Sequence, residues 1–292
     1  MHPLRRVATL ACALFFAAAG AASADPALWV VESPHAKVYL FGTVHVLRPQ
    51  QSWHTAPLDA ALAESAELWL EVTNADDPQA AAPIVRSLGI DAAHPLSTKL
   101  SKTDLARVDN AAKAIGAPAG EAAFEPFRPW LASLTFSVVP LLKAGYDPKS
   151  GVDMQLKSAF QARGKPVRGF ETIDQQMHFF ADLPADQEVA LLDATLDRVD
   201  SAATVLDSLV AAWSAGDVDR FAALENDDMF RCAPGLYDRL VVQRNAAWAR
   251  QLDARLHDPG ISFVAVGAAH LAGAASVQSR LAALGYRVRR VQ

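Results

Sequence analysis

Two short segments near opposite ends of the chain, Phe41–His45 (FGTVH) and Val266–His270 (VGAAH), share a Gly-x-x-His pattern directly after an apolar run. We expect each run to be a β-strand and each histidine to lie on the loop at the strand's carboxyl end, where open α/β sheets build their sites. The glycine would let the backbone turn sharply, because glycine alone takes positive φ without penalty. The matched spacing predicts that His45 and His270 share one catalytic or metal site; two unrelated structural histidines are the alternative.

The sequence around these clusters has the pattern of two β–α–β units, one at each end of the chain. The expected elements are strands 28–32 and 37–41, helix 57–65 and strand 67–72, then strand 261–266, helix 274–284 and strand 287–291. Aligning the two histidines also aligns Tyr39–Phe41 with Val264–Val266, which hints at two related half-units. Both histidine-bearing strands are apolar enough to be interior, so we expect them to be neighbours near the sheet centre.

Residues from about 80 to 235 are expected to form a mostly helical cap. Expected helices are 103–115, 130–144, 150–163 and hairpins over 173–223, with a short strand at 166–170 and a long helix at 236–257. The segment Trp130–Ala144 is nearly all apolar, but it is too short for a membrane span and predicts a core helix. The sequence thus predicts a single α/β domain over residues 25–292, with a mixed sheet from the two units and a large central helical insertion.

The first 24 residues have the pattern of a secretory signal peptide. Arg5 and Arg6 precede an unbroken run of apolar and small residues over 7–19, and Ala22–Ala24 provides an A-x-A cleavage site. The run is too short to anchor the mature protein in a membrane. We therefore expect a periplasmic or secreted protein that begins at Asp25 and has no mature transmembrane segment.

The composition after cleavage excludes some classes of partner. The remaining 25 basic and 32 acidic side chains give a formal charge of −7, so we do not expect nucleic-acid binding. Cys232 would be the remaining cysteine, which rules out an intrachain disulfide, and we expect it to be a small packing residue. No oligomeric state follows from the sequence.

Four side chains with useful chemistry are expected at one edge of the sheet: His45, Glu71, Glu171 and His270. Imidazole and carboxylate groups are the ligands of hydrolytic Zn²⁺ and Mn²⁺ sites. The same groups also form a general base with its orienting acid, which needs no metal. Each glutamate alternatively fits a helix cap or a surface position.

Three further residues are candidates either for the site or for structural roles. Arg244 and Asn245 border the apolar stripe of a helix, where an arginine either binds an oxyanion or carboxylate or extends its head to solvent. Asp153 starts a helix and is most simply an N-terminal cap. Because loop residues contribute little to a core, replacing His45 or His270 is expected to change stability little.

Seven stretches of the chain resemble the TraB/GumN family: LFGTVHVLRP, LWLEV, PFRPW, GVDMQL, GFETIDQQ, RNAAWA and FVAVGAAHLAG. The resemblance runs from about Trp29 to Val291. This group includes the Tiki metalloproteases and is distantly similar to erythromycin esterases and the haem-binding ChaN proteins. The resemblance implies a mixed α/β core with a helical insertion and a site built from both Gly-x-x-His motifs.

Matched motif by motif, the resemblance places His45 and His270 at the motif histidines, Glu71 at the acid after the next strand and Arg244 at the arginine upstream of the second motif. The secondary candidates are Gly42, Gly267, Glu171, Asp153 and Asn245.

From the residues and the resemblance together we expect an exported metal-dependent hydrolase that acts on a peptide or a small amide or ester. His45, Glu71 and His270 would hold a divalent ion (Mn, Co or Zn), with Glu71 as third ligand or base. Arg244 would steady a substrate oxyanion or terminal carboxylate. The alternative is a non-catalytic protein of the same fold that binds a peptide or haem.

Overall fold

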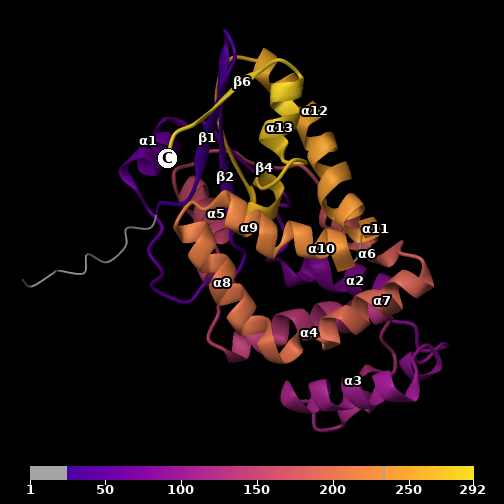
Figure 1. The fold of residues 1–292 in the computed structure, drawn as a ribbon. Coiled ribbons are helices and arrows are strands. Elements are labelled where there is room, and N and C mark those ends of the chain that lie inside the picture. Colours follow the sequence, from indigo (N-terminus) through magenta and orange to yellow (C-terminus); the bar gives the residue numbers. More distant parts are fainter. Residues whose placement is uncertain (1–24, 233) are drawn as a thin grey trace, which may run out of the picture.

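The computed structural model describes residues 25–232 and 234–292. In this part of the chain six strands form one sheet in the order β4-β3-β5-β2-β1-β6 (Figure 1). Neighbours among β4, β3, β5 and β2 are parallel, whereas β1 runs antiparallel to both β2 and β6. The sheet is therefore mixed, and the predicted α/β fold class is confirmed. The strands are β1 (Leu28–Glu32), β2 (Ala36–Thr43), β3 (Glu67–Leu70), β4 (Val167–Gly169), β5 (Gly260–Gly267) and β6 (Arg287–Arg290).

The two histidine-bearing strands, β2 and β5, are direct neighbours at the centre of the sheet, as predicted. Their register differs from the alignment of the two motifs, because Gly42 lies beside Val266 and Thr43 lies beside Gly267. A shift of one residue moves a side chain to the opposite face of a sheet. The two Gly-x-x-His clusters are therefore not equivalent in the fold, although their spacing in the sequence is the same.

Helices cover both faces of the sheet, because strands β2 and β5 carry apolar side chains on both faces. Tyr39 and Phe41 of β2 face the core beneath α1, α5, α8 and α9, while Val38 and Leu40 face the core beneath α12 and α13. Figure 1 shows α1 on one side of the strands and α12 and α13 on the other. The covering helices are α1 (Ala56–Glu64), α5 (Val152–Ala162), α8 (Ala202–Ser214), α9 (Val218–Leu224), α12 (Gln243–His257) and α13 (Val277–Ala283).

Between β3 and β5 the regular elements of the described chain are helices, except for β4, which returns to the sheet edge beside β3. Two satellite cores hold this insertion together: Phe124 and Phe136 pack among α3, α4 and α7, and Trp130 and Met177 pack among α2, α4 and α6. Helix α3 lies at the end of the molecule remote from the sheet (Figure 1). The remaining α-helices are α2 (Pro78–Gly89), α3 (Lys102–Ala114), α4 (Pro129–Lys143), α6 (Ile173–Ala181), α7 (Ala185–Leu196), α10 (Asn226–Cys232) and α11 (Pro234–Tyr237).

Short helical turns connect these elements and account for the largest differences from the expected boundaries. The helix expected over 236–257 contains a π-helical turn, η5 (Asp238–Val242), before α12. The helix expected over 274–284 begins later, at Val277, because Gly273 takes positive φ and Ser276 is its N-cap. The 3₁₀ turns are η1 (Leu96–Thr98), η2 (Gly120–Phe124), η3 (Pro148–Ser150), η4 (Val199–Ser201) and η6 (Ala268–Leu271).

Within the described ranges no helix is both long enough and apolar enough to cross a membrane. The apolar α4 packs against α7 and α8 and has Trp130 and Phe136 fully buried, as expected for a core helix. The signal peptide expected over 1–24 lies outside the described residues, and so does the side chain of Cys232.

Strand β3 begins with an acid, Glu67, and is followed directly by another, Glu71; Glu67 is hydrogen-bonded to the surrounding sheet. Its carboxylate accepts hydrogen bonds from Trp69, Arg168, Arg255 and Ser262, at 2.7 to 3.0 Å. Burial opposes ionisation, but these donors lower the pKa of Glu67 to about 2, from an ordinary value of 4.5. Glu67 thus stabilises the fold in its ionised form.

A Glu67→Gln variant should lose on the order of 2 kcal/mol of unfolding free energy at pH 7, because charge-assisted hydrogen bonds to two arginines are removed. Since the pKa of Glu67 is lowered in the fold, its contribution is complete above 4.5 and disappears as the pH falls toward 2. Urea unfolding measured between pH 7 and pH 2.5 should show the unfolding free energies of the parent and the variant becoming similar as the pH falls. Glu32→Gln, a change at an exposed end of β1, is the control; equal stability of parent and Glu67→Gln at pH 7 would contradict the assignment.

Candidate functional site

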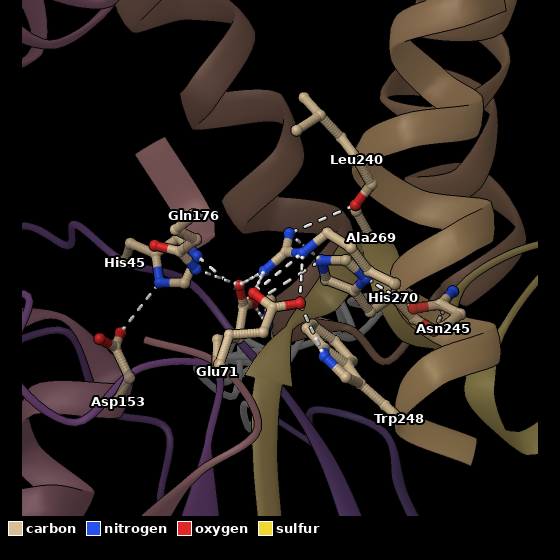
Figure 2. Close-up of polar contacts among 12 residues, drawn as sticks. His45, Glu71, Asp153, Gln176, Leu240, Asn245, Trp248, Ala269 and His270 are labelled. Carbon is tan, nitrogen blue, oxygen red and sulfur yellow. Dashed lines mark hydrogen bonds and ion pairs between the residues drawn. The ribbon is translucent and has the colours of Figure 1, made fainter. Parts of the chain in front are cut away.

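The carboxylate of Glu71, directly after β3, is the centre of a polar cluster at the carboxyl edge of the parallel strands (Figure 2). Its Oε1 accepts the backbone N–H of Gly267 at 2.7 Å, and its Oε2 accepts Arg244 at 2.6 Å and Gln176 at 3.2 Å. The side chain is 11% exposed. Donors from β5, α12 and α6 therefore fix one carboxylate group between segments that are far apart in the sequence.

His45 lies on the loop after β2, as predicted, and is open on one side. Its Nδ1 lies 3.2 Å from Oδ1 of Asp153, and its Nε2 lies 3.9 Å from Oε1 of Glu71. The His45 side chain is 60% exposed. Because Asp153 takes the Nδ1–H, the Nε2 atom is the one directed at Glu71 (Figure 2).

Asp153 is not the helix cap that was expected, because Gly151 occupies the N-cap position of α5 and makes no side-chain cap bond. Asp153 lies in the first helical turn, where its carboxylate is free to reach across to His45. The sequence could not show this partnership, since 108 residues separate the two.

His270 is in a different environment, within the 3₁₀ turn η6 and only 5% exposed. Its Nδ1 lies 2.6 Å from Oδ1 of Asn245, its Nε2 accepts Arg244 Nη1 at 3.1 Å, and its ring packs against Trp248. The Nε2 atom is also 3.7 Å from Oε1 of Glu71. The expectation that His270 is a loop residue of little structural weight is therefore wrong, because its ring is part of the buried wall.

Arg244 is 8% exposed and all five of its N–H groups are engaged. Nε and Nη2 donate to Glu171, Nη2 also donates to Glu71, and Nη1 donates to the carbonyl of Leu240 and to His270. Leu240 belongs to the π-helical turn η5, so this irregular turn supplies one of the acceptors. That Arg244 binds a substrate oxyanion stays a prediction. To do so, Arg244 would have to give up one of these hydrogen bonds and donate to the substrate instead.

Glu171 follows β4 and anchors the far side of the guanidinium. It accepts Arg244 at 2.9 to 3.2 Å and the indole N–H of Trp248 at 2.8 Å, and its side chain is 8% exposed. The sequence leaves two possibilities for Glu171: a helix cap or surface group, or a residue of the site. The structure places it in the polar cluster, and Thr172, not Glu171, caps α6. Asn245 likewise lies in the cluster and fixes the His270 ring.

The charges of the cluster set different protonation states for the two histidines. Desolvation opposes an imidazolium at His45, but the hydrogen bond and charge of Asp153 and the charge of Glu71 raise its pKa to about 9. Burial, opposed by Glu71 but reinforced by Arg244, lowers the pKa of His270 to about 3. Burial also acts against ionisation of Glu71, yet the neighbouring positive charges and the Gly267 N–H hold its pKa well below the usual range.

The two motif glycines are needed for space and not for their φ, so the expectation of a positive-φ turn is wrong. Neither is among the glycines with positive φ, and that of Gly267 is −48°. A Cβ on Gly42 would lie 3.0 Å from the Cα of Ala268. A Cβ on Gly267 would lie 3.1 Å from Oε1 of Glu71 and 3.3 Å from Nε2 of His45. Gly267 thus keeps open the space that His45, Glu71 and His270 border.

A cavity of about 470 Å³ opens in front of His45, Glu71 and Asp153. Arg244, His270, Asn245 and Trp248 lie behind Glu71 and are not part of its lining. The other lining residues are Thr43, Val46, Leu70, Val72, Ala75, Asp76, Pro148, Lys149, Met154, Gln176 and Ala265. The site therefore has a front that ligands can reach and a buried wall that holds the front in place.

Two residues of the cluster were not singled out from the sequence. Gln176 donates to Glu71 from α6, and Trp248 donates to Glu171 from α12. The stretches GFETIDQQ and RNAAWA contain both residues. Their polar contacts depend on how α6 and α12 meet, which helical periodicity does not specify.

An Arg244→Met variant should lose about 3–5 kcal/mol of unfolding free energy, because Glu71 and Glu171 would be left buried without their cation. The double variant Arg244→Met/Glu171→Gln should recover part of this loss, since one stranded charge is removed. Urea unfolding at pH 7 measures both. Arg250→Met, a change at an exposed position on the same helix, is the control for helix propensity and net charge. If Arg244→Met were as stable as the parent, this account would be contradicted.

Comparison with known proteins places this arrangement in a family. Residues 27–290 match the model of the TraB/PrgY/gumN family, a span that contains every residue of the cluster. Neither the curated proteins nor the solved structures gave a match. The match covers nearly the whole chain, including the helical insertion and both Gly-x-x-His motifs, and on this basis the chain belongs to the TraB/PrgY/gumN family.

Proposed function

We propose that this protein is an exported hydrolase of peptide or similar amide bonds that works with a divalent ion held by His45, Glu71 and His270. The observation that carries the proposal is the convergence of two imidazole Nε2 atoms on one carboxylate oxygen. They lie 3.9 and 3.7 Å from Oε1 of Glu71, across the space that Gly267 leaves open.

Two separations within the donor set, from Glu71 Oε1 to each imidazole Nε2, are compatible with such an ion. Ligand atoms of one tetrahedral ion with bonds of about 2.1 Å lie roughly 3.4 Å apart, close to the two separations above. Asp153 and Asn245 bind the Nδ1 atoms of His45 and His270, as outer partners of metal-ligating histidines do. The Nε2 of His270 also accepts Arg244, so coordination there requires the guanidinium to release this one bond. Mn²⁺, Co²⁺ and Zn²⁺ all suit these donors.

The charge of the cluster also favours a cation. It contains three carboxylates (Glu71, Asp153 and Glu171) and one guanidinium; with His45 protonated and His270 neutral its formal charge is −1, and it becomes −2 when His45 gives up its proton to act as a ligand. Uncompensated charge in a poorly solvated site is unfavourable. A divalent cation would neutralise this excess.

The protein side chains have separate parts in the proposed reaction. A bound divalent ion would polarise the scissile carbonyl and lower the pKa of water from ~16 toward ~7. Glu71 Oε1, which accepts the Gly267 N–H but no bond from Arg244, is the carboxylate atom placed to hold the ion. Asp153 orients His45, and Arg244 and the Gly267 N–H keep Glu71 ionised.

The cavity supports a peptide-sized substrate. Its volume of about 470 Å³ is within the range of small-ligand pockets. Its walls alternate apolar side chains, such as Val46, Val72 and Met154, with a few polar groups near Glu71. A short peptide with apolar side chains suits this combination, because its backbone is polar.

The decisive test is incubation of the protein, residues 25–292, with a diverse peptide library and Mn²⁺, Co²⁺ or Zn²⁺, read by mass spectrometry. We expect cleavage that falls by about 10² or more in a His45→Ala variant. His45 is the better position for this control than His270, because His45 is exposed and its loss leaves the buried wall intact. Cleavage that survives in His45→Ala would point to a contaminant. Retention of intact peptides, or a haem absorption band on titration, without cleavage would favour a non-catalytic binding protein.

A Gly267→Ala variant tests the ion site without removing a ligand. Its Cβ would enter the space between Glu71 and His45, so affinity for Mn²⁺ or Zn²⁺ should fall at least tenfold while the protein stays folded. Gly42→Ala is the matched control: its Cβ would meet the backbone of Ala268 instead, so it should lower stability and leave ion affinity of the folded protein unchanged. Titration calorimetry and urea unfolding give both quantities; equal ion affinity of the two variants would count against the proposed site.

Export is part of the proposal and rests on the pattern of residues 1–24, with the mature protein in the periplasm or secreted. Mass spectrometry of the mature amino terminus should find Asp25; an uncleaved or acylated terminus would exclude this reading.

A further inference from the structure

The cavity in front of Glu71 contains one cation that the cluster does not use. Each acid that lines the cavity is already paired with a basic side chain: Glu71 with Arg244, Asp153 with His45, and Asp76 with Lys157. Lys149 also lines the cavity and is exposed, and among the described residues its ammonium has no hydrogen bond or ion pair. Its charge is therefore available to a ligand.

The turn that carries Lys149 is held in a defined position. The backbone N–H of Lys149 donates to Oδ1 of Asp147 at 2.9 Å, and Pro148 fixes the first position of the 3₁₀ turn η3. Asp147 and Leu47 exchange two backbone hydrogen bonds, at 2.9 and 3.4 Å. The turn is thus bonded to the strand-end loop that follows His45.

The segment after Lys149 is packed directly on the backbone of His45. A Cβ on Gly151 would lie 2.2 Å from the carbonyl oxygen of His45, and the N–H of Val152 donates to the carbonyl of Val44 at 3.0 Å. Only glycine allows this approach. As a result the backbone that carries Lys149 and Asp153 is held against the backbone of the His45 loop, and all three residues line the cavity.

Arg244, the cation expected from the sequence to meet a substrate carboxylate, has no free donor in this arrangement. We propose that Lys149 takes this part and binds a carboxylate of the substrate, so that the site selects peptides with a free C-terminal carboxylate or an acidic side chain. The proposal rests on the peptide-directed function proposed above and adds its substrate class. A cation at the edge of a cleft with low-dielectric walls attracts anionic groups more strongly than one on a flat surface.

Binding can be measured apart from turnover, in a chelating buffer, by titration calorimetry. The probes are acetyl-Ala-Leu-Ala with a free carboxylate, the same peptide as its C-terminal amide, and acetyl-Ala-Glu-Ala amide. The carboxylate-bearing probes should bind about 5- to 10-fold more tightly than the uncharged amide. The comparison between the first and third probes shows whether the terminal or the side-chain carboxylate is preferred.

Three variants assign the preference to a residue. Lys149→Gln should abolish it and Lys149→Glu should reverse it. Lys102→Gln makes the same charge change at an exposed position on the remote helix α3 and should leave it unchanged (Figure 1). Substitutions at exposed positions change stability little, so each variant should fold. Circular dichroism verifies this.

Equal affinities for the charged and uncharged probes, no binding of any probe, or a preference that survives in Lys149→Gln would each overturn the proposal. Failure of the hydrolase is a separate result. A carboxylate preference in binding without cleavage of any peptide would leave Lys149 as the selecting residue of a binding protein. Cleavage without a carboxylate preference would leave the hydrolase and remove this assignment.

Discussion

The carboxylate of Glu71 accepts N–H groups from three separate parts of the chain: the backbone at the end of β5, a guanidinium from α12 and an amide from α6. A buried carboxylate without such donors would be strongly unfavourable. The position of Glu71 therefore requires the sheet, the long C-terminal helix and the insertion to be assembled together. The space bordered by the two histidines exists only when this carboxylate is in place.

The helical insertion does more than cover the sheet. It supplies Asp153, which orients His45, and Gln176, which donates to Glu71. It also returns to the sheet as β4, so that Glu171 can pair with Arg244. A sheet with only the two terminal β–α–β units would keep His45, Glu71 and His270 but would lose the partners that fix their orientation.

The two Gly-x-x-His motifs use one spacing for two different environments. His45 is exposed and paired with a carboxylate, which stabilises its protonated form, whereas His270 is buried and paired with an amide and a guanidinium, which stabilise its neutral form. The one-residue register offset between β2 and β5 accompanies this difference. Such a pair is unlike a symmetric repeat, and it places one histidine at the cavity and the other in the wall behind it.

Much of the frame follows from the sequence alone. Apolar runs with period-two or helical spacing predicted the strands, the helices and the central pairing of β2 with β5, because burial of apolar side chains determines which faces meet. The same reasoning brought His45, Glu71, Glu171 and His270 to one edge, since the carboxyl ends of parallel strands coincide there. Loop chemistry follows less well from the sequence: Asp153 fits the pattern of a helix cap, and Gly42 and Gly267 fit the pattern of residues with positive φ, but the structure shows neither.

Only the tertiary structure decided which side chains of the site are exposed to the cavity and which are buried and fully hydrogen-bonded. The full engagement of Arg244, the burial of His270 and the position of Lys149 at the cavity depend on contacts between segments that are distant in the sequence. Local patterns encode which face of an element is apolar, but they do not encode the register or the angle at which two elements meet. Differences of one residue in register and a few ångströms in packing decide which donor reaches which acceptor, because hydrogen bonds require a narrow range of distance and direction.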